Sequence, residues 1–248
     1  MIDSLLASST YRLRKTLRPA PAPHTRRKRS AGGTSAFWSA GQTLRISFLN
    51  GTCPWYKKAI VTTACHWLEY AHLHLRLVHD NDGHAEIRIR TDVAEDINYS
   101  VLGNQSLNEP EESMAIGAKL SDPRFESTVL HEFGHALGME HEHQHPHANI
   151  PWDLKALRRL LREVLEKEVD DQRALENAIE DELTTQFLPV PDDGNRLLLP
   201  YDKQSIMHYQ VRQSHTVGNW KSERNDAISE GDKRFMRLVY PRPCQLRC

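Results

Sequence analysis

The stretch Val-Leu-His-Glu-Phe-Gly-His-Ala-Leu-Gly-Met-Glu-His-Glu, residues 129–142, decides how this chain is interpreted. His131 and His135 are four residues apart, so on a helix they lie on one face, one turn from each other. Both imidazoles can then reach a single metal ion at about 2.0–2.1 Å. Glu132 follows the first histidine directly, and there its carboxylate can reach a water on the metal without itself being a ligand.

A third histidine, His141, completes the pattern only if the helix stops before it. On a continued helix His141 would be rotated by about 80° from the face that carries His131. Gly138 stands where a left-handed residue would let the chain turn sharply and return His141 to the metal. We therefore expect His131, His135 and His141 to hold one zinc ion.

Three neutral histidines leave zinc with its full charge and with an open coordination position, which is the catalytic form of a zinc site. The ion lowers the pKa of its water towards ~7 and polarises a carbonyl. Glu132 can take the proton as general base and pass it to the leaving amine. The alternative, an ordinary core helix that carries histidines, would leave three histidines and a glutamate without partners among apolar residues.

With these residues in place, the stretch from His131 to His141 resembles the extended zinc motif of the metzincins. In that superfamily the residue after the third histidine differs between families, and Glu142 is the one typical of astacins. Residues 201–209, Tyr-Asp-Lys-Gln-Ser-Ile-Met-His-Tyr, resemble the astacin Met-turn. The resemblance implies that Met207 forms the apolar floor beneath the metal. It also implies that Tyr209 is a weak fifth ligand that moves to stabilise the tetrahedral intermediate.

The resemblance covers residues 37–241 and includes the closing segment 228–241. The four cysteines do not have the spacing of the two disulfides of animal astacins, and the aspartate-containing latency segment of those enzymes is not evident in residues 1–34. The chain is therefore more similar to the astacin-like zincins of microbes.

Composition agrees with a folded domain that is preceded by a basic tail. Of the 248 residues, 39% are hydrophobic and 26% charged, and no apolar run is long enough to span a membrane. The first 30 residues hold eight of the 32 Lys and Arg but one of the 33 acidic residues, so the remainder is acidic and unlike a nucleic-acid binder. The start also lacks a secretory signal pattern, although the family resemblance implies secretion.

We expect residues 1–34 to be a disordered tail and residues 35–248 to be the catalytic domain. Alternating prolines and the basic run at residues 26–29 cannot bury enough apolar surface to offset the entropy of ordering. The tail is either a pro-segment that is cleaved at this basic run or an extension without consequence. Oligomeric state is left open.

Four cysteines form either two disulfides, with three possible pairings, or four free thiols in a reducing compartment. They are Cys53, Cys65, Cys244 and Cys248.

The rest of the pattern predicts strands first and helices later. Alternation predicts strands at 44–49 and 85–90, with shorter ones near 100–102 and 114–116. Helical spacing predicts a helix over 55–78, one from about 122 through His135, one long or two shorter helices over 154–183, and a last helix that begins with a capping box at Ser229.

Three further histidines, His143, His145 and His147, alternate with other polar residues after the zinc motif. They are either solvated loop histidines or part of a second metal site, and Pro146 argues against the second. His208, between Met207 and Tyr209, could point into the core or into the cleft.

The sequence thus predicts an α+β, metzincin-like domain in two lobes. A twisted mixed sheet and the active-site helix make the first lobe, the second is mainly helical and irregular, and zinc lies at the floor of the cleft between them. By the resemblance, an extended peptide or protein substrate binds along an edge strand near residues 100–103. The expected activity is that of a zinc metalloendopeptidase. A non-cleaving binding protein on this scaffold and hydrolysis of a non-peptide amide are the alternatives.

Overall fold

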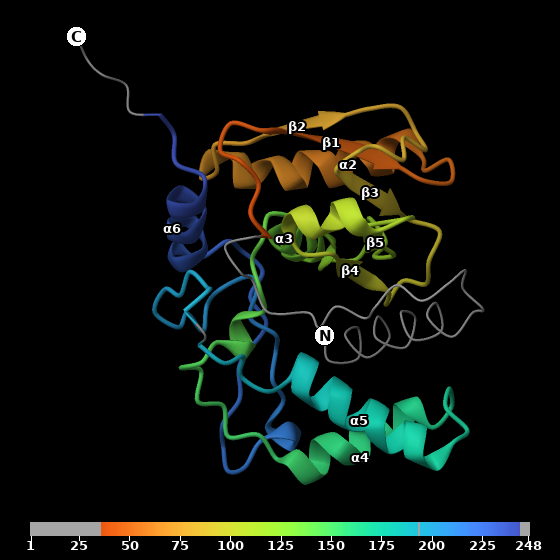
Figure 1. Ribbon diagram of the computed structural model, residues 1–248, viewed down its shortest axis with the longest axis vertical. Helices are drawn as coiled ribbons and strands as arrows, with labels where there is room; N and C mark the ends of the chain where they lie inside the picture. Colours follow the sequence, from red (N-terminus) through yellow and green to blue (C-terminus); the bar gives the residue numbers. More distant parts are fainter. Residues whose placement is uncertain (1–35, 193, 244–248) are drawn as a thin grey trace.

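A computed structural model describes residues 36–192 and 194–243 (Figure 1). One sheet is built from five strands: β1 (Thr43–Phe48), β2 (His74–Leu77), β3 (Ile87–Arg90), β4 (Asn98–Ser100) and β5 (Met114–Ile116). The strand order is β2-β1-β3-β5-β4, and every neighbouring pair is parallel except β4, which runs antiparallel to β5 at one edge. The predicted α+β fold with a mixed sheet is confirmed. The predicted tail lies outside the described residues.

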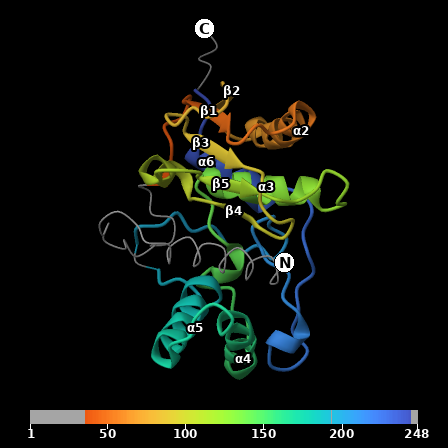
Figure 2. The same ribbon diagram turned by 90° about the vertical axis from the view of Figure 1, so that its right-hand side faces the viewer.

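Two helices, α2 (Pro54–Ala64) and α3 (Phe125–Ala136), pack against the sheet and against each other (Figures 1 and 2). Their buried side chains share one core with the strands, to which they contribute Ile60, Ala64, Val129, Leu130 and Phe133. The indole of Trp67, just beyond α2, donates a hydrogen bond of 3.0 Å to the carbonyl of Leu130. The helix that carries the first two histidines is therefore fixed on the side that faces the sheet.

The helix predicted over residues 55–78 was too long. Helix α2 ends at Ala64, a 3₁₀ segment (Cys65–Glu69) follows, and the chain then forms strand β2, parallel to β1. Residues 72–77, His-Leu-His-Leu-Arg-Leu, alternate polar and apolar side chains, which is the period of a strand and not of a helix. The other strand predictions agree with the sheet to within a few residues.

The second lobe contains a helical hairpin, α4 (Leu154–Leu165) and α5 (Gln172–Gln186), which lies apart from the sheet in Figure 1. Each helix starts at an aspartate N-cap, Asp153 or Asp171. The hairpin has its own small core, made by Leu157, Leu161, Leu165, Leu175, Ile179, Leu183 and Phe187. Of the two alternatives for residues 154–183, two shorter helices are the outcome.

The last helix, α6 (Glu230–Val239), returns the chain to the first lobe. It begins with the predicted capping box, in which Ser229 and Asp232 each accept a backbone N–H of the other residue. At its other end the Tyr240 hydroxyl donates 2.8 Å to the carbonyl of Leu137, beside the end of α3. The end of the last helix is therefore attached to the chain within the histidine motif.

Two of the four cysteines, Cys53 and Cys65, carry free thiols, and Cys244 and Cys248 lie outside the described residues. Within residues 36–192 and 194–243, none of the helices combines the length and apolar character that a membrane crossing requires.

Candidate metal centre

Helix α3 brings His131 and His135 together as their spacing predicts. Ten of its twelve residues are buried, and the two imidazole ring centroids lie 4.8 Å apart. The helix presents apolar side chains to the sheet, so its histidine face is turned towards the second lobe. Both rings therefore lie on one helix face at the boundary between the lobes.

Backbone carbonyls fix which nitrogen of each ring carries the hydrogen. The Nδ1 atom of His131 lies 2.9 Å from the carbonyl oxygen of Ile206, and that of His135 lies 2.8 Å from the carbonyl oxygen of Met139. A carbonyl oxygen can only accept, so Nδ1 donates in both rings and Nε2 keeps its lone pair. A metal-binding histidine usually donates the hydrogen of its other ring nitrogen to a carbonyl or carboxylate in this way.

The chain turns at Gly138, as the sequence predicted, with φ at +94°. The amide of Gly138 donates 2.8 Å to the carbonyl of His135, and the next amide, of Met139, donates 2.9 Å to the carbonyl of Gly134. These bonds close the end of α3 and reverse the chain. As a result, Nε2 of His141 comes to 2.9 Å from Nε2 of His135.

The three histidines fit a single zinc ion. Their candidate ligand atoms all lie within 4.8 Å of one another, and two nitrogen ligands on one tetrahedral zinc ion are about 3.3 Å apart. Nε2 of His131 is buried and has no hydrogen-bond partner among the described residues, although a metal ion would satisfy it. Burial lowers the pKa of His131 to about 4, so this ring is neutral at pH 7, as metal ligation requires.

Met207 lies against the same helix, at Gly134. A Cβ added at Gly134 would clash with the sulfur atom of Met207, so this glycine leaves the room that the Met207 side chain occupies. The Met207 side chain is fully buried, and its carbonyl accepts a 3.1 Å hydrogen bond from the amide of Glu142. The methionine turn is therefore tied to the helix and also to the segment that carries the third histidine.

The ring of Tyr209 lies among the histidines. Its centroid is 4.3 Å from that of His141 and 5.4 Å from that of His131. On another side it stacks on His143 at 4.7 Å. The tyrosine is thus placed beside two of the three candidate ligands.

Two glutamates of the motif, Glu132 and Glu142, are largely shielded from solvent, but in different surroundings. Glu132 is buried on α3 next to His131. The carboxylate of Glu142 accepts a 2.7 Å hydrogen bond from the amide of Asp202. Burial raises the pKa of Glu142 to about 8.

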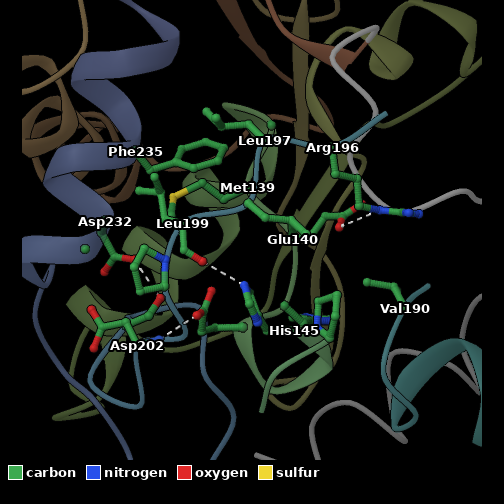
Figure 3. A pocket seen from close by; sticks show the side chains of 18 of the residues that line it. Met139, Glu140, His145, Val190, Arg196, Leu197, Leu199, Asp202, Asp232 and Phe235 are labelled. Atoms are coloured by element: carbon green, nitrogen blue, oxygen red, sulfur yellow. Dashed lines mark hydrogen bonds and ion pairs between the residues drawn. The ribbon is translucent and has the colours of Figure 1, made fainter. Parts of the chain in front are cut away.

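A pocket of about 70 Å³ lies beside this carboxylate (Figure 3). Glu142 and His145 line it together with Asp202 and with Asp232 at the start of α6. In Figure 3 the two aspartates lie near each other on one side of the pocket, and Phe235 is close by.

The interpretation of the histidines that follow the motif is corrected in part. His143 and His145 are buried, not solvated, and each places Nε2 near a backbone carbonyl, that of Gln186 at 2.7 Å and that of Leu199 at 2.8 Å. Among the described residues only the His131 triad groups three possible ligands closely enough for a metal. The two buried histidines are therefore structural, and the sequence offers no pattern from which these distant carbonyls could have been found.

His208 belongs to the core and not to the cleft. It is fully buried, and its Nδ1 donates 2.7 Å to the carbonyl of Tyr209. Its Nε2 accepts from the hydroxyl of Tyr201 at 2.8 Å. Both nitrogens are thus used to hold the turn together.

Comparison with known proteins adds two structures of myroilysin. Both are 32% identical to this chain over 84% of its length; one has a TM-score of 0.71 and covers 97% of the myroilysin chain, and the other has a TM-score of 0.61 and covers 87%. High choriolytic enzyme 1, a hatching enzyme zinc-protease from Oryzias latipes (medaka fish), is 16% identical with a TM-score of 0.53 over 84% of this chain and 95% of its own, and shares the fold. No protein-family model and no curated protein matches the sequence.

Proposed function

Because this chain belongs to the astacin-like zinc metalloproteases and is a metalloendopeptidase, we propose which of its residues carry the reaction. His131, His135 and His141 hold zinc, Glu132 is the general base, and Tyr209 is the oxyanion donor. The observation that carries the proposal is the convergence of one ligand atom from each of three histidines, two of which already bind a carbonyl through Nδ1–H.

Zinc, when bound, supplies a Lewis acid that makes a water molecule more acidic and polarises a peptide carbonyl. Glu132 takes a proton from the attacking water and delivers it to the nitrogen of the leaving amine. The burial of Glu132 next to His131 supports this role. In a site shielded from bulk water, the proton that the carboxylate has taken passes to the leaving amine and is not lost to solvent. The hydroxyl of Tyr209 donates a hydrogen bond to the oxyanion that forms on the substrate carbon.

The substrates are peptides or proteins. We infer that an extended substrate pairs with β4, the antiparallel edge strand, through backbone hydrogen bonds. This strand lies beside α3 (Figure 1), so a peptide along it would pass close to the histidine face of the helix.

The test is casein cleavage by the full chain, with wild type beside Glu132→Ala and each measured with and without a zinc chelator. We expect Glu132→Ala to lose at least about 10²-fold in kcat, because general-base catalysis contributes roughly 10²–10⁴-fold. Zinc content, measured by mass spectrometry of the metal, should equal that of wild type because Glu132 is not a ligand.

Wild-type cleavage should vanish on chelation and return with added zinc. Full casein cleavage by Glu132→Ala would refute the assignment of the base. Zinc binding by wild type without any turnover of casein or small amides would point instead to a binding role.

A further inference from the structure

We propose that Asp232, at the start of α6, is a positioning residue for the metal site. It holds the turn at residues 205–207 so that the carbonyl of Ile206 orients the ring of His131. The inference rests on the proposed function, because it takes His131 to be a metal ligand.

Asp232 is a buried carboxylate without an ion-pair partner among the residues that the structure describes. Its side chain is 2% exposed, and three donors surround it. The hydroxyl of Ser205 donates at 2.6 Å to one oxygen, while the amides of Ile206 and Ser229 each donate at 2.9 Å to the other. Hydrogen bonds to a carboxylate are stronger than those between neutral groups, so this aspartate fixes its neighbours firmly.

Two of these three bonds do nothing for the helix. A capping box requires only the reciprocal bonds between Ser229 and Asp232. The bonds to Ser205 and Ile206 reach 27 and 26 residues back along the chain. They connect the start of α6 to the methionine turn, which a helix cap alone would not do.

The connection continues from the turn to the metal site. The hydroxyl oxygen of Ser205 accepts a 3.0 Å hydrogen bond from the amide of Met207, which braces both sides of Ile206. The carbonyl of Ile206 then accepts from Nδ1 of His131 at 2.9 Å. Since that bond selects the tautomer and the orientation of the ring, any movement of the turn is passed to the Nε2 atom that faces the metal.

The serines on the two sides of Asp232 separate this role from helix capping. Ser205→Ala removes the hydrogen bonds that the Ser205 hydroxyl makes with Asp232 and with the amide of Met207, and leaves the bond from the Ile206 amide and the capping box intact. Ser229→Ala is the matched control, because the Ser229 hydroxyl caps α6 and donates to the side chain of Asp202 but does not contact Ser205 or Ile206. Each replaces one buried or half-buried hydroxyl by hydrogen.

The experiment measures zinc dissociation constants by competition with a chromophoric chelator, and records the visible spectrum of the cobalt-substituted full chain. We expect Ser205→Ala to bind zinc about tenfold more weakly, within the 10–100-fold range for outer-shell partners, and to shift the cobalt bands. Ser229→Ala should lower the melting temperature but keep zinc affinity within about twofold of wild type.

Asp232→Ala should reproduce the loss, and Asp232→Asn should recover most of it, because the amide can still accept from the two backbone N–H groups and donate to Ser205. This rescue would assign the effect to geometry. If Ser205→Ala keeps wild-type zinc affinity and the wild-type cobalt spectrum, Asp232 is only a helix cap and the inference is overturned. Wild type that binds zinc no better than His135→Ala would instead overturn the metal site itself.

Discussion

The imidazole of His145 uses both of its nitrogens inside the fold. Its Nε2–H donates to the carbonyl of Leu199 at 2.8 Å, and its Nδ1 accepts from the amide of His147 at 3.0 Å. Only the neutral ring can do both, because a protonated imidazole has no acceptor. Burial lowers the pKa of His145 and His147 adds to the effect, although Asp192 opposes it.

This lowered pKa predicts a loss of stability in acid. Below the ordinary value of 6.5, the unfolded chain binds a proton at this position more readily than the folded chain. Stability that is present above that pH is therefore lost as the pH falls towards the lowered pKa. His145→Gln keeps a donor for Leu199 and cannot titrate, so its free energy of unfolding should fall less between about pH 7 and pH 5.

Urea unfolding of both proteins at several pH values measures the difference. At pH 8 the variant should be less stable by about 1 kcal/mol, the typical worth of one lost hydrogen bond. Parallel pH profiles would show that His145 does not contribute to the acid sensitivity, which would then belong to the other buried histidines.

At the scale of elements, the end of α3 depends on Gly138. The left-handed φ of +94° is open to glycine and costly for other residues. An added Cβ would also lie 2.7 Å from the ring of Phe37. The glycine thus permits both the turn that returns His141 and the packing of an earlier segment against that turn.

Gly138→Ala should lower the free energy of unfolding by about 2 kcal/mol. A left-handed backbone costs alanine about 1–2 kcal/mol, and the displacement of the Phe37 ring adds to this cost. Zinc affinity should fall as well, because the turn places His141. Gly218→Ala is the matched control: its φ is +76° and nothing lies within 4 Å of the added Cβ. In denaturation, Gly218→Ala should show the cost of the left-handed backbone alone, and in the chelator assay its zinc affinity should equal that of wild type. Equal zinc affinity in the two variants would contradict the role of the Gly138 turn.

The sequence predicted those elements whose signal is local. The helical spacing of the motif predicted α3, and the capping box at Ser229 predicted the start of α6. Strand β2 was missed because its four residues follow directly on a helical pattern, and its pairing with β1 is a contact between distant segments. No local preference records such a contact, although the alternation of residues 72–77 has the period of a strand and marks the end of the helical pattern.

At the scale of the whole molecule, the same distinction divides the candidate site. The three histidines and Glu132 are close in sequence, and their spacing was enough to predict the convergence of the histidines. Groups that support them come from far along the chain: the carbonyl of Ile206 for His131, and that of Met207 for the amide of Glu142 next to His141. These are backbone atoms, which every residue has, so no residue type could have marked them.

Because the ligands converge only in the folded chain, zinc should stabilise the molecule as a whole. At a free zinc concentration of 100 times the dissociation constant, the gain is about 2.7 kcal/mol. For a chain of this size that corresponds to a melting temperature roughly 5–10 °C higher with zinc than after chelation.

Scanning calorimetry of wild type and His135→Ala, each with zinc and with chelator, checks this expectation. The variant lacks one ligand, so its melting temperature should respond little to zinc. An equal rise in both proteins would mean that zinc binds elsewhere.

The hydrogen bonds around the metal site join residues that are far apart in the sequence, and this separation affects the order in which the site can form during synthesis. Ile206 comes 75 residues after His131, and Asp232 another 27 after Ser205. A ribosome makes the chain from its N-terminus, so the three histidines emerge well before the turn and the helix that orient them. A growing chain that ends before Ile206 therefore holds the ligands without their supports, and hydrolytic power is expected only after the turn and α6 have been made.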